Sequence, residues 1–326
     1  MAGVPQEHLA FPYRTHICVN WIFLATGGSL LHAVANHTDK YLLTRYLKQG
    51  DVAALTIFSA LFSALVLPAT LLVCPDVLNV TPLRALALTA NGMLLVLALL
   101  CYFHALQRDE ASYVVPLYQT IPLFGFVLGY GLLGETVSPM QAAASCVVAI
   151  GALVLSFEIA GPIRFKREVV LLMLLASLCY ALNGVAFKWL AVDDGFWPCI
   201  FWTHVGKVVS GLLFLLLPGP RRRFVALLKD NDAPVLGINS VSETLFIAGD
   251  GLAFYATLFA PVVLVQAAHA LQPVFVLALG VALSVFFPQL GEESLGRKQM
   301  LQKLIGVAAI IAGTFFLTAC SQLRGT

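Results

Sequence analysis

Long apolar segments separated by short polar connections make up almost the whole chain. Runs of about 18 to 25 residues that are apolar on every side are long enough to cross a bilayer as helices. The run "ALTANGMLLVLALLCYF" is typical, and it lacks the alternation that transmembrane β-strands require. The pattern predicts ten such helices, at residues 17–37, 52–74, 85–106, 112–133, 137–158, 169–191, 197–217, 235–259, 262–287 and 300–320.

Composition places these helices in a membrane. Of the 326 residues, 60% are hydrophobic and only 11% are charged, and the mean hydropathy is +0.89. A soluble domain carries about 25% charged residues, so this chain has too few to cover a surface in water. We therefore predict an all-α, polytopic membrane protein surrounded by the lipid bilayer, and we expect it in the plasma (inner) membrane.

The ten helices form two blocks of five, at residues 17–158 and 169–320, after a polar tail at residues 1–16. "ANHTDKYLL" and "NGVAFKWLA" each place a lysine after the first helix of a block. "QTIPLFGFVLGYGLLGE" aligns with "ALQPVFVLALGVAL" and a later "GEE", so a proline and a Gly-Glu pair recur in the same order. Because five is odd, two such blocks cross the membrane in opposite senses. This predicts an inverted repeat, which secondary transporters use for alternating access around a central site.

The same stretches resemble the EamA-type, ten-helix members of the drug/metabolite transporter superfamily. The resemblance is carried by "NHTDKYLL", "ALQRDEASYVVPLYQTIPLFGFVLGYGLLGE" and "LFAPVVLVQAAHALQPVFVLALG", and it covers nearly the whole chain. It implies the transporter fold. It does not imply a substrate, because members of this superfamily carry very different solutes.

Charged side chains inside the predicted helices are the first candidates for function, since each is costly near the bilayer centre unless it is paired or faces water. Glu243 and Asp250 lie seven residues apart, on nearly one face of the eighth helix. His204 and Lys207 lie about one turn apart on the seventh, so the four could meet. One interpretation makes a carboxylate the proton carrier of a transport cycle. The other is a buried ion pair of Lys207 with one carboxylate, which only holds two helices together.

The fourth and ninth helices carry matched polar stripes that contain proline. The residues are Tyr118, Gln119 and Pro122 in the first block, and Gln266, His269 and Pro273 in the second. Proline frees a backbone carbonyl and kinks a helix, so we expect this pair of helices to line a central cavity. Helix packing stays open as the alternative role of the glutamines, and a hydrogen-bonded structural role as that of the histidine.

Each repeated lysine stands at a helix end and has an asparagine nearby. Asn36 lies one turn before Lys40, and Asn183 lies just over one turn before Lys188. The ammonium groups could extend to the lipid headgroups. Alternatively, they could serve as a gate or as a contact for an anion.

Acidic motifs outside these candidates have simpler explanations. Glu135 and Glu292 close short connections, where a solvated turn is the expected setting. "EESLGR" matches a pattern of CAAX-type membrane proteases, but no histidine follows His269 to hold a metal. "IAGDG" lacks the first glycine of the intramembrane aspartyl protease loop. We therefore expect no enzyme activity, no cofactor and no metal site, with an intramembrane enzyme or a multidrug exporter as the alternatives.

The remaining features narrow the partners. Seven cysteines are scattered singly, as expected for buried apolar residues rather than disulfides or metal ligands. The net charge of +2 gives no reason to expect a nucleic-acid partner. "GFVLG" fits close helix packing, and both a monomer and a homodimer stay open.

Membrane orientation receives two conflicting indications. Most of the 19 lysines and arginines fall in the odd-numbered connections, which predicts that these connections face the cytoplasm. The family resemblance implies instead that both termini do. For function the prediction is a secondary transporter of small polar metabolites, proton-coupled or exchanging, because the predicted lining is rich in amides, histidines and charges.

Overall fold

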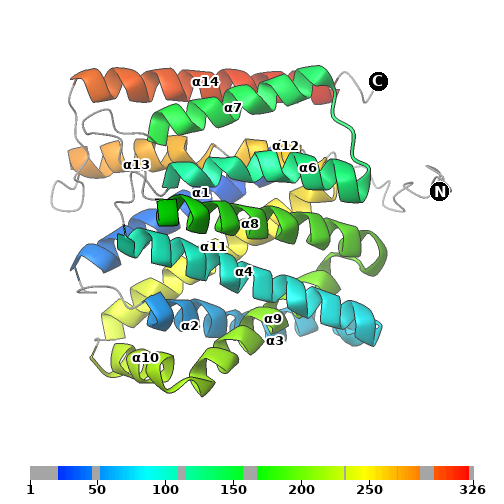
Figure 1. Cartoon of the computed structure of the whole chain (residues 1–326), viewed down its shortest axis with the longest axis vertical. Coiled ribbons are helices and arrows are strands. Elements are labelled where there is room, and N and C mark those ends of the chain that lie inside the picture. The colour runs from blue at the N-terminus through cyan, green and yellow to red at the C-terminus, as the bar shows by residue number, and fades with distance from the viewer. Residues whose placement is uncertain are drawn as a thin grey trace.

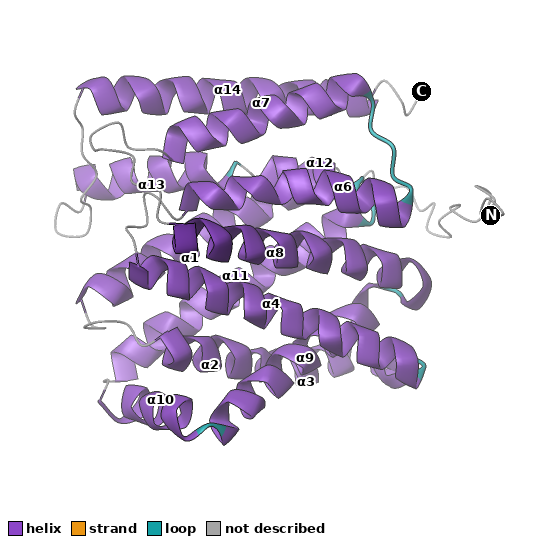
Figure 2. Cartoon of the chain, in the orientation of Figure 1, coloured by secondary structure: helices purple, strands orange, loops and turns teal. Residues whose placement is uncertain are grey.

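The computed structural model describes residues 21–45, 52–108, 115–156, 167–230, 233–269, 271–286 and 297–322. Within these ranges every regular element is a helix, and Figure 2 shows no strand among them. The prediction of an all-α fold is confirmed.

Helices occupy each range predicted for the first block. The second range is divided by a short 3₁₀ turn, and the fourth begins with one. The elements are α1 (Trp21–Arg45), α2 (Val52–Phe62), η2 (Ser63–Leu65), α3 (Val66–Val73), η3 (Pro75–Leu78), α4 (Pro82–Arg108), η4 (Val115–Thr120), α6 (Ile121–Leu133) and α7 (Pro139–Ser156).

The second block follows the same order, with one addition. The elements are α8 (Arg167–Asp194), α9 (Phe196–Leu216), α10 (Pro218–Asp230), α11 (Ala233–Thr257), α12 (Val262–His269), α13 (Gln272–Phe286) and α14 (Arg297–Gln322). Helix α10 was not predicted, because it is a short amphipathic element inside a connection, with exposed arginines at positions 221–223.

Several of these helices suit a membrane interior. Five segments of the described chain are long and apolar enough to cross a bilayer: Val52–Val73, Pro82–Ala105, Arg167–Asp194, Phe196–Leu216 and Val262–Leu283. Three shorter apolar helices accompany them, at Ile121–Leu133, Pro139–Gly151 and Leu304–Phe316. The protein is therefore a polytopic membrane protein, while the number of ten crossings stays a prediction.

The predicted fourth and ninth helices are each interrupted next to the proline of their polar stripe. Pro122 is the second residue of α6, where the 3₁₀ turn η4 gives way to α-helix. Pro273 is the second residue of α13, after the break that separates α13 from α12. Proline has no N–H for the preceding turn, so a new helix begins at each position. Discontinuous helices of this kind form the substrate sites of many transporters.

Helix packing relates the two blocks. α1 packs against α11, while α8, the first helix of the second block, packs against α4, which corresponds to α11 in the first. α7 pairs with α14, the last helix of the other block, as Figure 1 shows. Equivalent helices of the two blocks thus pack against equivalent partners. An inverted repeat predicts this exchange, and the repeat itself stays a prediction.

One end of the helix bundle holds several connections that matter below. η3, residues 134–138 and the turn at Gly195 all lie on the right in Figure 1. Hydrogen bonds and an ion pair join residues 135, 188, 260 and 262 at this end. We call it the even end, because it contains the even-numbered connections between the predicted membrane helices.

Candidate functional site

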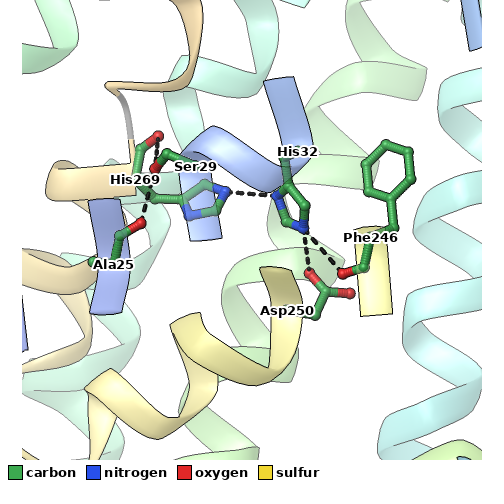
Figure 3. A network of polar contacts seen from close by, with 6 residues as sticks. All are labelled: Ala25, Ser29, His32, Phe246, Asp250 and His269. Atoms are coloured by element: carbon green, nitrogen blue, oxygen red, sulfur yellow. Dashed lines mark hydrogen bonds and ion pairs between the residues drawn. The ribbon is translucent and has the colours of Figure 1, made fainter. Parts of the chain in front are cut away.

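Two histidines and an aspartate form a buried chain between α1, α11 and α12 (Figure 3). His32 Nδ1 lies 2.9 Å from His269 Nε2, and His32 Nε2 lies 3.4 Å from Asp250 Oδ1. The same Nε2 lies 3.2 Å from the carbonyl oxygen of Phe246. The side chains of His32 and Asp250 are only 6% and 16% exposed, so the surrounding helices largely shield the chain from water. We call these three residues the histidine chain.

Close packing of α1 on α11 brings the histidine chain together. A Cβ added to Gly28 would lie 2.7 Å from the carbonyl oxygen of Gly249, so the two helices meet backbone to backbone. A Cβ on Gly249 would lie 2.5 Å from the ring of His32, which fills the space above that glycine. Ser29 Oγ shares its hydrogen between the carbonyl oxygens of Ala25, at 2.9 Å, and of His269, at 3.1 Å, and so ties the end of α12 to α1.

Hydrogen-bond geometry determines where the protons of the histidine chain lie. Asp250 and the Phe246 carbonyl both accept, so His32 Nε2 carries a hydrogen. When His32 is neutral, its Nδ1 accepts from His269 Nε2. His269 Nδ1 is then a buried lone pair with no hydrogen-bond partner in the described chain. A proton that binds there can be passed through His32 toward Asp250 without a change of position of the rings.

The two carboxylates of α11 have different partners. Asp250 belongs to the histidine chain, whereas Glu243 accepts a short hydrogen bond from Ser59 Oγ of α2. Within the described residues no ion pair of 4.0 Å or less joins Lys207 to either carboxylate. The structure therefore does not contain the direct ion pair of that interpretation, and the role of Lys207 stays a prediction. His204 also stands apart, since its Nδ1–H donates to the carbonyl of Ile200 on its own helix, at 2.9 Å.

A second polar cluster, at the even end, contains the ion pair of Glu135 and Lys188. Glu135 Oε1 lies 2.6 Å from Lys188 Nζ, and Glu135 Oε2 accepts a hydrogen bond of 2.9 Å from the N–H of Val262, the first residue of α12. Lys188 Nζ also donates to the carbonyl of Ala260, at 2.7 Å. The side chains of Glu135 and Lys188 are 12% and 15% exposed. The expectation of a solvated turn at Glu135 is wrong, and the Lys188 ammonium points into the protein rather than to headgroups.

Two glycines turn Glu135 back over α6. Gly134 ends this helix with a φ of +63°, a left-handed conformation that favours glycine. The N–H of Glu135 then donates to the carbonyl of Gly129, at 3.1 Å. Because Gly129 has no side chain, there is room for the carboxylate: a Cβ there would lie 2.9 Å from Glu135 Oε2. The sequence "GYGLLGE" therefore builds the position of this carboxylate.

Gln266 lies between the ion pair and the histidine chain along α12. Val262, Gln266 and His269 are four and three residues apart, so they share one face of α12. The Gln266 amide lies against Gly125 of α6 and Gly184 of α8, which have no side chains to exclude it. Its Oε1 is buried without a hydrogen-bond partner among the described residues. We call this face of α12 the polar column.

The other predicted site residues lie outside the polar column. Tyr118 of η4 packs its ring against Tyr102 of α4 and Tyr180 of α8, with centroids 5.1 and 6.0 Å apart. Asn183 is fully buried and exchanges side-chain to backbone hydrogen bonds with Asn91, so it joins α8 to α4.

Three further predicted residues lie in the first block. Asn36 is half-buried on α1. The side chains of Lys40 and Gln119 lie outside the described residues.

Two important residues were not among the predicted site residues. His32 is an ionisable side chain inside an apolar segment, which is itself a signal of function. Glu135 is the glutamate of the Gly-Glu pair that recurs in both blocks. Pairing this pattern with the repeated lysine would have identified the ion pair.

Comparison with known proteins supports the transporter fold described above. Residues 19–157 match the model of the EamA-like transporter family, which confirms the resemblance noted in the sequence. No curated protein matches the chain. The crystal structure of another protein covers 94% of this chain and 99% of its own length, with a TM-score of 0.68 and 17% identity. At that identity the likeness concerns the fold alone, and it extends over both blocks.

Proposed function

We propose that this protein is a secondary transporter that moves a small polar metabolite by alternating access and couples this movement to protons. The match to the EamA-like transporter family supports a membrane transporter of the drug/metabolite kind. The observation that carries the finer proposal is the polar column, a line of buried polar groups on a helix of the second block that faces α6 of the first block.

Atoms of the polar column lack partners. Gln266 Oε1 and His269 Nδ1 are buried and have no hydrogen-bond partner within the described chain. Leaving a buried polar atom unpaired costs about 1–3 kcal/mol. Such a cost is tolerated where a ligand supplies the missing hydrogen bond, so we assign these two atoms to substrate and proton binding.

The location of the column suits alternating access. It is a face of α12 in the second block, and it packs against α6 of the first block and α8 of the second. A rocking motion of one block against the other opens such an interface first at one end and then at the other. The histidine chain stands at the inner end of the column, where gain or loss of a proton changes the charge that the substrate meets. Protonation and substrate binding are thereby linked.

The experiment is uptake into proteoliposomes with an imposed pH gradient. A pooled extract of small metabolites is the probe, and the parent is compared with Asp250→Asn and Glu243→Gln. We expect gradient-driven accumulation of a solute in the parent and its loss in Asp250→Asn. Glu243→Gln should retain most of it, because Glu243 bonds to Ser59 rather than to the histidine chain.

Two outcomes would overturn the proposal. One is the absence of any solute accumulation in the parent with either direction of the gradient. The other is a solute that is chemically altered rather than moved, which would indicate an intramembrane enzyme.

A further inference from the structure

The carboxylate of Glu135 occupies a site with two donors. Lys188 Nζ contacts one oxygen at 2.6 Å, and the N–H of Val262 donates to the other at 2.9 Å. Both donors belong to the second block, on α8 and α12, whereas Glu135 follows α6 of the first block. The site and its occupant therefore lie on opposite sides of the interface that alternating access must open.

The donors stay together without Glu135. Lys188 Nζ is also held by the carbonyl of Ala260, two residues before Val262 and in the same block. If the blocks part at the even end, Glu135 leaves with the first block. The remaining ammonium and backbone N–H are then arranged to receive the two oxygens of another carboxylate.

An empty site of this kind is unfavourable. Lys188 is only 15% exposed, and a largely buried ammonium needs an anionic partner or water. An anion that replaces Glu135 therefore lowers the free energy of the open conformation. The geometry selects a carboxylate, because the present occupant is one and each of its oxygens has its own donor.

We propose that this site binds the carboxylate of the transported substrate, and that Glu135 takes the substrate's place when the even end is closed. This inference rests on the transporter function proposed above and names its substrate class. Gln266 lies four residues along α12 from Val262, about 6 Å deeper at 1.5 Å per residue. Its Oε1 has no hydrogen-bond partner among the described residues, so it is free to accept one from the substrate. The substrate is therefore a small carboxylic acid that also carries a hydroxyl or amino donor.

Equilibrium binding to the purified full-length protein tests this proposal. The probes are short-chain hydroxy- and aminocarboxylates, each paired with its primary amide, and binding is measured by calorimetry or thermal shift. We expect carboxylates to bind and their amides not to bind. Lys188→Gln should abolish carboxylate binding, whereas Glu135→Gln should tighten it about tenfold, because the internal competitor has lost its charge.

The opposite effects of Lys188→Gln and Glu135→Gln on carboxylate binding distinguish a substrate site from a purely structural ion pair. A structural pair predicts that both variants lose binding together, and that result would overturn the proposal, as would equal binding of acids and amides. A second variant guards against misfolding: Gly129→Ala displaces the Glu135 carboxylate without removing either charge, and should also tighten carboxylate binding. Its control is Gly131→Ala on the same helix, where a Cβ meets no atom within 4 Å.

These experiments can reject the binding proposal and the transport proposal separately. Transport of a solute without a carboxylate, combined with no carboxylate binding, would reject the substrate class and leave the transporter function standing. Carboxylate binding with the expected signs, but no uptake into proteoliposomes, would support the anion site and reject transport.

Discussion

Two sets of ion pairs join the first block to the second at the even end, and they differ in burial. Arg84 of α4 donates to Asp193 and Asp194 at the end of α8, at 2.7 and 2.8 Å. The side chains of Arg84 and Asp193 are 37% and 59% exposed, whereas Asp194 is only 13% exposed. We call these three residues the exposed cluster, after their cation. The side chains of Lys188 and Glu135 are only 15% and 12% exposed, so neither partner of that pair faces water. Arg84, the cation of the first set, already faces water, whereas the ammonium of Lys188 is largely buried and needs an anion or water when the blocks part. We therefore expect the first set to make a weak contact between the blocks and the second to form the selective site proposed above.

The largest effect should come from removing the buried cation. Lys188→Met leaves the Glu135 carboxylate buried without its counter-ion. Breaking a buried pair from one side costs about 3–5 kcal/mol. We expect a clear loss of thermal stability of the detergent-solubilised protein, measured by the temperature at which it unfolds or aggregates.

A charge swap sharpens this prediction. Glu135→Lys combined with Lys188→Glu restores the mutual attraction of the pair. It also points an ammonium at the N–H of Val262 and a carboxylate at the carbonyl of Ala260, which are the wrong backbone groups for each. We therefore expect little recovery of stability. Full recovery would mean that the two backbone groups do not orient the site, and that it resembles the exposed Arg84 cluster.

An intermediate effect is expected from the uncharged part of the polar column, which the exposed cluster lacks. A Cβ on Gly125 would overlap the Gln266 amide, so Gly125→Ala should push that side chain out of the column. We expect about a tenfold fall in substrate uptake, the loss of one hydrogen bond to the substrate. Gly131→Ala should transport as the parent does, since its Cβ meets nothing within 4 Å. Equal uptake by both variants would show that Gln266 is not part of the substrate site.

The helices could be predicted from sequence because apolar length is a local property. A kink at Pro122 and at Pro273 was predicted for the same reason, since proline acts on its own turn, and the structure has a change of element next to each. The shared face of Gln266 and His269 also follows from helical spacing alone. These features need no knowledge of which helix packs against which.

The contacts of the site depend on packing that local patterns do not contain. From the sequence alone, Glu135 is expected in a solvated turn. In the structure, Gly134 folds it back over α6. The partner of Asp250 is decided by the close approach of α1 to α11. Glu243 shares a helix face with Asp250, yet it meets Ser59 of α2, because α11 passes different neighbours along its length.

The smallest effect should come from the exposed cluster. Arg84→Gln removes the cation of this cluster, but water and salt already reach Arg84 and Asp193, which are 37% and 59% exposed. We expect transport and stability close to those of the parent at high ionic strength, with a modest loss of stability that is visible only at low ionic strength. Thermal shift and uptake at two salt concentrations measure this. A large loss that persists in high salt would show that the exposed cluster also holds the blocks together, and the contrast with the buried pair would then lie in selectivity rather than in strength.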